Sequence, residues 1–403
     1  MIRQPPWRSL MPTTRTRSLL ALALAGLITA TALPGAVAGE GKGTGKGRGR
    51  DDGGGTVTVV ASGLDSPRHL TVTSRGDVYV AESGTGGDDC VLGVAPGAPD
   101  PVPVCAGPSG AVTKIGRDGG QGRVVTGLPS LAVGAEASGP YDVEVTGSSK
   151  LVVTFGLGNP PATRDALVAE HGRDYRRLAT VQEIRLRGKG APRFETEADL
   201  ARHETRRNPD GGLLDTNSVS LARDRGGWLV ADAGANAVLR VDDDRVRTLA
   251  VLAGGTTEFP PGSGNPFPFQ PVPTSAVRGP DGAVYVSQLT GFPFPQGGAA
   301  IWRIGRDGTP RVWASGLTNV TDLAFDAKGA LYAVQISDVG LAAETGLPSG
   351  SLVKVRRGSS THTTVLDDLP APFGVALSKD AAYVTTCAVC AGGGTVVRVG
   401  LGR

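Results

Sequence analysis

The 403-residue sequence contains few of the side chains on which enzyme active sites are most often built. It has four histidines, four cysteines and two methionines, and only 5% of its residues are aromatic. No two histidines stand at a metal-binding spacing, and neither a nucleophile elbow nor a phosphate-binding glycine loop occurs. The sequence therefore gives no support to the enzyme classes that these motifs mark.

Strong charge of either sign is also absent. The chain has 41 lysine and arginine residues against 38 acidic residues, for a formal net charge of +3 at pH 7. The basic excess lies within the first 55 residues, so the remainder is close to neutral. Nucleic-acid binding needs a basic face that this balance does not supply, and we set that class aside.

No apolar run reaches the roughly 20 residues that a membrane-spanning helix needs. The longest run follows a basic segment and ends near Ala36-Val37-Ala38, which predicts a signal peptide over residues 1–38, with Met1 or Met11 as its start. No twin arginine and no cysteine after the run accompany it, so we expect a secreted, extracellular protein without a membrane anchor. Residues 39–55 are too poor in apolar side chains to fold and predict a glycine-rich, basic, flexible tail.

A hairpin pattern recurs six times in residues 56–403. Each copy has two runs of alternating apolar residues around a polar turn, as in SAVRGPDGAVYVSQL at 275–289, which is typical of paired β-strands. The last unit lacks an outer strand, whereas residues 56–64 form an outer-type strand with no unit before them. We therefore predict an all-β fold, a six-bladed β-propeller of four-stranded antiparallel blades in which the N-terminal strand completes the last blade. A solenoid is the alternative fold.

Several insertions interrupt the pattern. Residues 164–178 and 198–206 are rich in helix formers and predict two short helices. Residues 259–269 and 291–295 place phenylalanines among prolines in two loops. These rings either line a hydrophobic or sugar-stacking cleft or cap the core beneath the loops.

The four cysteines of an exported chain predict two disulfides. Cys90 and Cys105 flank one loop, which favours their pairing with each other among the three possible connectivities. Cys387 and Cys390 would form the second bond. A redox or zinc site is the alternative for this second pair, although no histidine lies nearby in the sequence.

Polar residues gather where the innermost strands of a propeller would begin and where the following loops would converge. Oxygen ligands in such a ring suit hydroxyl-bearing ligands, and Asp142, Asn217 and Asp322 suit calcium, the one candidate cofactor. The competing interpretation is that Asp142 and Asp322 accept hydrogen bonds from the backbone at strand starts. The predicted ligand-binding residues at the channel mouth are His69, Tyr141, Asp142, Asn217, Gln288 and Asp322.

Several segments together resemble the ScyD/ScyE family, secreted NHL-like propellers named for the scytonemin biosynthesis cluster. The matching segments are NPDGGLLDTNSVSL at 208–221, LVADAGANAVLRV at 229–241 and AVYVSQLTGFPFPQGGAAIWRI at 283–304. The resemblance implies an exported six-bladed propeller and offers no catalytic residues to carry over. Arg68-His69, where the family tends to glycine, and the pair Cys387 and Cys390 depart from its pattern.

These observations predict an extracellular binding or scaffold protein, a monomer, with its ligand site at the channel mouth. The expected partner is a small molecule, a glycan or an extracellular protein. The alternative is a calcium-dependent lactonase or esterase of the gluconolactonase type, with Asn217 and Asp322 as two metal ligands. Arg68 and His69 stand where such enzymes need a glutamate, so Glu82 would have to replace it.

Overall fold

The computed structural model describes residues 56–94, 100–188, 190–242 and 245–402. The predicted signal peptide and the predicted glycine-rich tail lie outside the described residues.

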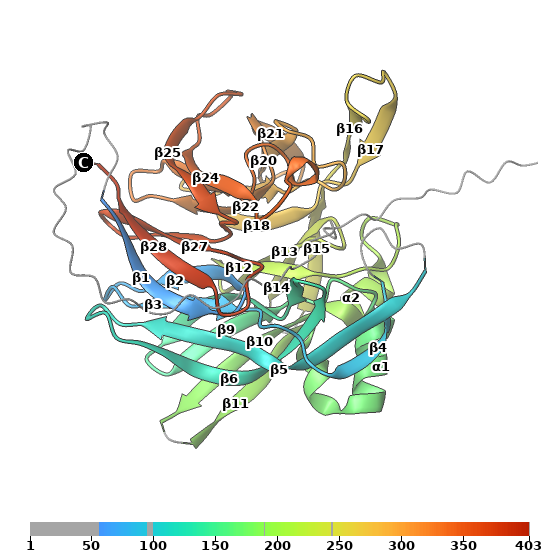
Figure 1. Cartoon of the computed structure of the whole chain (residues 1–403), viewed down its shortest axis with the longest axis vertical. Helices are drawn as coiled ribbons and strands as arrows, with labels where there is room; N and C mark the ends of the chain where they lie inside the picture. Colours follow the sequence, from blue (N-terminus) through green and yellow to red (C-terminus); the bar gives the residue numbers. More distant parts are fainter. Residues whose placement is uncertain (1–55, 95–99, 189, 243–244, 403) are drawn as a thin grey trace, which may run out of the picture.

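Six antiparallel sheets follow one another along the described part of the chain, as Figure 1 shows. The first contains β2 (Pro67–Val72), β3 (Val78–Glu82), β4 (Asp89–Gly93), β5 (Val102–Ile115), β6 (Gln121–Val133) and β7 (Glu136–Ser138). The second contains β8 (Pro140–Gly147), β9 (Lys150–Phe155), β10 (Thr180–Arg187) and β11 (Gly190–Asp199). The third contains β12 (Ser218–Asp224), β13 (Gly227–Asp232), β14 (Ala237–Asp242) and β15 (Arg245–Val251).

The remaining three sheets continue the same pattern. The fourth contains β18 (Pro273–Arg278), β19 (Val284–Gln288), β20 (Ala299–Ile304) and β21 (Pro310–Leu317). The fifth contains β22 (Val320–Phe325), β23 (Leu331–Gln335), β24 (Ser349–Lys354) and β25 (Thr363–Pro370). The sixth contains β26 (Val375–Leu377), β27 (Ala381–Thr386), β28 (Gly394–Gly400) and β1 (Val57–Leu64). The all-β prediction is confirmed, and the fold is a β-propeller.

The two ends of the described chain meet in the sixth sheet. β1 pairs antiparallel with β28, with Val57 opposite Val399 and Leu64 opposite Gly394. The hydroxyl of Thr385 on β27 also donates to the carbonyl of Arg68 on β2 at 2.7 Å, which links the sixth sheet to the first. The N-terminal strand thus completes the last sheet, as the sequence predicts.

The apolar core lies between neighbouring sheets. One cluster joins Leu64 and Val396 of the sixth sheet to Leu70, Val80 and Ile115 of the first. Because each sheet packs on both sides, all residues of the second strands β3, β19 and β23 are buried. The alternation in these strands predicts only one buried face, and the second buried face comes from this packing.

Two insertions fold as helices. The segment predicted as one helix over 164–178 forms α1 (Pro161–His171) and a 3-10 turn, η1 (Arg173–Arg177), and the break falls at Gly172, where φ is +120°. The second prediction matches α2 (Leu200–Arg207), whose Asp199 cap accepts a hydrogen bond from the amide of Arg202. A second 3-10 turn, η2, spans Leu341–Ala343. Among the described residues, no helix is long and apolar enough to cross a membrane.

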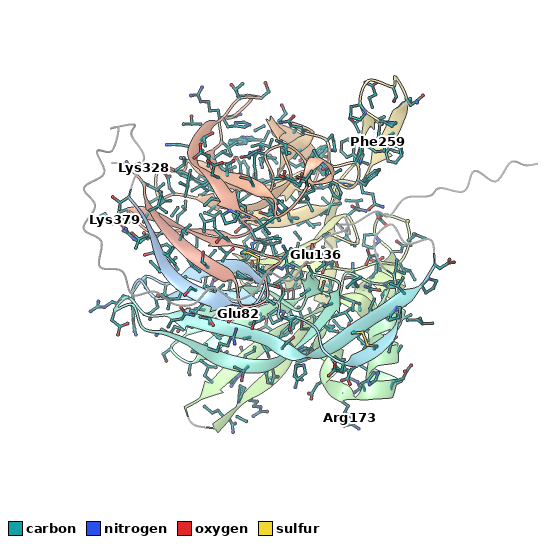
Figure 2. All side chains as sticks on the ribbon, in the orientation of Figure 1. Glu82, Glu136, Arg173, Phe259, Lys328 and Lys379 are labelled. Carbon is teal, nitrogen blue, oxygen red and sulfur yellow. A yellow bond between two sulfur atoms is a disulfide. The ribbon has the colours of Figure 1, made fainter. Side chains whose placement is uncertain are left out.

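The first sheet and the insertion before the fourth sheet depart from the expected pattern. Strands β4 and β7 enlarge the first sheet to six strands. The phenylalanine-rich segment at 259–269, expected as a loop, takes part in a two-stranded hairpin of β16 (Gly255–Glu258) and β17 (Pro266–Phe269). Figure 1 shows this hairpin projecting from the body of the molecule, and Figure 2 shows Phe259 on it.

Candidate functional site

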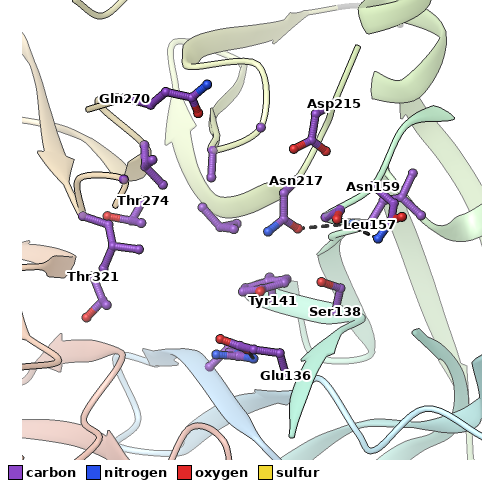
Figure 3. Close-up of a pocket in the computed structure, with 18 of the residues that line it drawn as sticks. Glu136, Ser138, Tyr141, Leu157, Asn159, Asp215, Asn217, Gln270, Thr274 and Thr321 are labelled. Atoms are coloured by element: carbon purple, nitrogen blue, oxygen red, sulfur yellow. Dashed lines mark hydrogen bonds and ion pairs between the residues drawn. The ribbon is translucent and has the colours of Figure 1, made fainter. Parts of the chain in front are cut away.

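Two cavities lie along the centre of the propeller. The axial cavity, of about 220 Å³, is lined only by residues of the six innermost strands, β2, β8, β12, β18, β22 and β26. The mouth cavity, of about 170 Å³, is lined by residues at or just before the starts of these strands and by the loops around them. Figure 3 shows the mouth cavity. Its lining includes Arg68, Glu136, Ser138, Tyr141, Leu157, Asn159, Asp215, Asn217, Val219, Val272, Thr274, Leu289, Thr290, Phe294, Thr321 and Phe373.

Arg68 is a buried cation that lines the mouth cavity. Its side chain is 1% exposed, and its guanidinium carbon lies 4.9 Å from the ring centroid of Tyr141 and 4.8 Å from that of Phe373. It donates hydrogen bonds to the carbonyl of Ala137 at 2.7 Å and to the carboxylate of Glu136 at 3.2 Å. The two rings and the two acceptors hold a buried cation in one orientation. Arg68 faces the mouth cavity, whereas its neighbour on β2, His69, lines the axial cavity.

Asn217 is held at the edge of the mouth cavity by the second sheet. Its Oδ1 accepts a hydrogen bond from the amide of Leu157 at 3.2 Å. A Cβ atom at Gly156 would lie 2.4 Å from this oxygen and 2.6 Å from the ring of Tyr141, so the close approach requires glycine. Figure 3 shows the side chains of Asn217 and Tyr141 on the same side of the cavity.

Asp215 brings an unusual carboxyl group to the mouth cavity. Burial, reinforced by the neighbouring Asp232, raises the pKa of Asp215 to about 7. Asp232 itself accepts hydrogen bonds from the hydroxyl of Thr216 at 2.6 Å and from the amide of Asn217 at 2.7 Å. Asp215 therefore changes its charge near neutral pH, while Asp232 fixes the segment that carries Asn217.

The axial cavity holds the other predicted acidic residues, and their oxygens accept hydrogen bonds from the protein. Asp142 accepts from the amides of Val143 and Leu221, each at 2.7 Å. Leu221 lies on the next sheet, so this carboxylate ties two innermost strands together. These are the contacts of the competing interpretation, in which the aspartates serve the backbone.

Asp322 plays the same part between the fifth and sixth sheets. It accepts from the amides of Leu323 at 2.7 Å and Val375 at 2.8 Å, and from the hydroxyl of Ser275 at 2.8 Å. Nδ1 of His69 lies 3.1 Å from Oδ2 of Asp322.

Three groups in the axial cavity have raised pKa values. Burial raises the pKa of Asp142 to about 8, against the opposing effect of His69. Burial also raises the pKa of Glu144 to about 7. Burial opposes the protonation of His69, but Asp322 outweighs it and the pKa of His69 is raised. The axial cavity thus favours the protonated form of each of these groups.

The structure separates the residues predicted to form one site. Tyr141 and Asn217 line the mouth cavity, whereas His69, Asp142 and Asp322 line the axial cavity. Gln288 is 3% exposed, and its Oε1 accepts from the amide of Ala300 and the indole of Trp302. Asn217 and the two aspartates thus do not come together as a calcium site. In the described part of the chain, no three histidine, cysteine or acidic side chains are grouped to hold a metal.

Several residues that line the mouth cavity were not predicted from the sequence. Glu136 and Ser138 come from β7, a strand that the repeat pattern does not contain, and Asn159 follows β9. Figure 2 shows Glu136 near the middle of the molecule. Asp215 belongs to the segment NPDGGLLDTN, whose run of polar side chains was the available signal.

The predicted aromatic loops form one cluster that reaches the mouth cavity. Ring centroids lie 4.8 Å apart for Phe259 and Phe292, 5.6 Å apart for Phe267 and Phe292, and 6.2 Å apart for Phe292 and Phe294. Phe294 is buried and lines the mouth cavity. The cluster therefore connects the projecting hairpin to this cavity.

Both predicted disulfides are present. Cys90 and Cys105 lie opposite each other on β4 and β5 and are bonded, and Cys387 is bonded to Cys390 in the turn between β27 and β28. The described residues include no free cysteine.

Comparison with known proteins gives no family for this chain. No family model matches the sequence, and no curated protein matches it. Similar solved structures include a gluconolactonase from Xanthomonas campestris, at 11% identity over 86% of this chain and 90% of that one, with a TM-score of 0.48. A luciferin-regenerating enzyme has 10% identity over 86% and 96%, with a TM-score of 0.48. A streptogramin B lyase has 10% identity over 87% and 98%, with a TM-score of 0.44.

At these identities and TM-scores, the likeness names neither a ligand nor a reaction for this chain. A function for this chain must therefore be inferred from the mouth cavity itself.

Proposed function

We propose that this protein binds a small, largely apolar ring compound in the mouth cavity. The observation that carries the proposal is the lining, in which apolar side chains surround a few fixed polar groups. This combination is typical of small-molecule sites. The apolar part includes Leu157, Val219, Leu289 and Phe294.

The volume sets the size of the buried group. An apolar cavity of about 150 Å³ holds one benzene molecule in another protein. The mouth cavity, at about 170 Å³, has room for one ring of this kind. The rest of a larger ligand would lie outside, next to the aromatic cluster of Phe259, Phe267 and Phe292.

The polar groups set the chemistry of the ring substituents. Oδ1 of Asn217 accepts from the backbone, and among the described residues no acceptor takes a hydrogen bond from its Nδ2. This amide suits an acceptor on the ligand, such as a carbonyl, ether or hydroxyl oxygen. Asp215 suits a donor. The guanidinium of Arg68 is already paired with the carboxylate of Glu136, so the site does not need an anionic ligand to neutralise Arg68.

Backbone conformation supports a functional role for this part of the molecule. Val272, Thr290 and Phe294 line the cavity with φ angles of +51°, +71° and +54°. Side chains other than glycine rarely adopt this region, and a β-branched residue does so at a cost. Such strain gathers at ligand sites because the surrounding structure is selected to hold a particular shape.

The predicted signal peptide supports a role outside the cell. A secreted monomer that captures a small molecule agrees with the predicted signal peptide and with the resemblance to the ScyD/ScyE family, and both belong to this proposal. Glycans and extracellular proteins are less suitable partners, because the buried part of the site has room for one ring.

Binding can be tested with neutral ring compounds such as phenol, cyclohexanol and δ-valerolactone. We expect a saturable rise in melting temperature and a one-to-one isotherm for the better probes. Asn217→Asp keeps the oxygen that accepts from Leu157 and removes the Nδ2 donor, so it should weaken binding of acceptor-bearing probes about tenfold. Asn265→Asp, on the projecting hairpin, is the matched control and should bind as the unmodified protein does.

Two results would contradict the proposal. If none of the probes bound, the cavity would not be a ring-binding site. If a lactone were bound and hydrolysed, the protein would be an enzyme of the gluconolactonase type, and product formation in the lactone assay would reveal it.

A further inference from the structure

A group of buried oxygen atoms near the mouth cavity has no hydrogen-bond donor. Both carboxylate oxygens of Glu204 lack a partner among the described residues, although this side chain is only 1% exposed. Oδ1 of Asn208 and Oδ1 of Asp215 are also buried without a partner. Buried polar atoms are almost always paired, so four such acceptors in one segment call for an explanation.

The chain brings these acceptors together at the end of α2. Glu204 and Asn208 are four residues apart and share one helix face. Asn208 caps the helix in the left-handed conformation, with φ of +39°, and the following turn leads to Asp215. The charges of Asp232, Asp210 and Asp215 all act on Glu204.

No ion pair in the described part of the chain neutralises these carboxyl groups. Among the described residues, none of Glu204, Asp210, Asp215 and Asp232 takes part in an ion pair. Carboxyl groups in this position are stabilised either by protons or by a bound cation.

We propose that this cluster is a calcium-binding site, with Glu204, Asn208 and Asp215 as its side-chain ligands. Both oxygens of Glu204 would coordinate the ion, together with the amide oxygen of Asn208 and Oδ1 of Asp215. Calcium takes six to eight oxygen ligands in flexible geometry, and backbone carbonyls and water complete such sets. Only two of the three side chains are acidic, so the site does not need a group of three carboxylates.

The donor set selects calcium over other metals. All of the ligand atoms are oxygens, whereas zinc sites use cysteine sulfur and histidine nitrogen. The carboxyl end of α2 also points its partial negative charge toward this region. Asp215 lines the mouth cavity, so the ion would lie beside the proposed ring-binding site without being needed for the ring to enter.

The test uses the full-length protein after treatment with EDTA and dialysis. We expect calcium titration calorimetry to give one site, and added calcium to raise the melting temperature more than equal magnesium does. Glu204→Gln keeps the shape of the side chain and removes its charge, and it should lower the calcium affinity by at least about tenfold.

Glu144→Gln is the matched control, because Glu144 is another glutamate but lies in the axial cavity. It should leave calcium affinity unchanged. Asn208→Gly supplies a second variant in case Glu204→Gln does not fold, because glycine accepts the left-handed conformation while the amide oxygen is lost. It too should weaken calcium binding.

The proposal is overturned if the unmodified protein shows no calcium binding, or if both cluster variants bind calcium as tightly as it does. In that case calcium does not occupy the cluster, and added calcium should leave the melting temperature of the unmodified protein unchanged. Ring-probe binding is measured separately in EDTA, so failure of the calcium site and failure of the ring-binding site remain distinguishable.

Discussion

Among single residues, Arg68 is the buried cation at the centre of the propeller. The family that the sequence resembles tends to have glycine here, so Arg68 and His69 look like departures in the sequence alone. In the structure, Arg68 lies over two aromatic rings and lines the mouth cavity, while His69 lies 3.1 Å from Asp322 and lines the axial cavity. Both residues that look irregular in the sequence therefore line a cavity at the centre of the propeller.

Replacing Arg68 by lysine should destabilise the fold despite the conserved charge. Lysine lacks the planar fork that lies over Tyr141 and Phe373 and reaches Ala137 and Glu136 together. We expect the free energy of unfolding in urea to fall by about 3 kcal/mol, since a buried ionic contact is broken. Arg173→Lys, at an exposed position, should change it by no more than about 0.5 kcal/mol. Equal stability of the two variants would show that Arg68 acts as a simple positive charge.

At the scale of secondary-structure elements, side chains on the innermost strands link one sheet to the next. The hydroxyl of Thr274 donates to the carbonyl of Val320 at 2.7 Å, and the hydroxyl of Thr321 donates to that of Phe373 at 2.6 Å. Asp142 and Asp322 accept from backbone amides of the neighbouring sheet. Asp142 and Asp322 were predicted to bind a ligand, and the structure instead shows them bonded to the backbone. The two roles are hard to tell apart in a sequence, because a strand start and a binding site favour the same residue types.

Strand β1 gives a direct test of how the sixth sheet is completed. Leu64 is 1% exposed and packs between the sixth and first sheets, whereas Val59 on the same strand is 59% exposed. Leu64→Ala should lower the free energy of unfolding by about 3 kcal/mol because it leaves a cavity. Val59→Ala should cost no more than about 0.5 kcal/mol. If denaturant titrations gave the two variants the same stability, β1 would not be packed as described.

At the scale of the whole molecule, buried acidic groups make stability depend on pH. The pKa of Asp142 is about 8 and that of Glu144 about 7 in the folded protein, well above the ordinary values of 3.8 and 4.5. At a pH between the ordinary and the raised pKa values, the folded protein holds more protons than the unfolded chain. Its stability therefore falls as the pH rises through this range. The raised pKa of His69 acts in the same direction, since its contribution is lost as the pH rises through the folded value.

We therefore expect the melting temperature to be several degrees higher at pH 5 than at pH 8. Asp142→Asn removes one of these carboxyl groups while keeping an oxygen that accepts from Leu221, so it should flatten the decline. Asp307→Asn is the control, because Asp307 is paired with Arg311 and its pKa is lowered, which affects stability only at more acidic pH. A flat profile for the unmodified protein between pH 5 and 8 would contradict the description of the axial cavity. Measurements in EDTA keep calcium binding from altering the profile.

The β-propeller, the completion of the sixth sheet by the first strand, the two disulfides and the positions of two short helices could all be predicted from the sequence. These features depend on local periodicity, turn residues and cysteine placement, and all of these are contained in short stretches of chain. The hairpin at residues 255–269 and the additional strands of the first sheet were missed because their residues have no regular alternation.

Which polar residues line the same cavity could not be predicted from the sequence and is known only from the tertiary structure. Asn217 precedes β12 and Asp142 lies within β8, and a small difference in position along the strand puts them in different cavities. Asp215 and Glu204 are eleven residues apart, yet both have buried oxygens without donors, as does the intervening Asn208. Burial and the absence of a partner depend on packing between sheets and loops, and a sequence pattern does not contain that information.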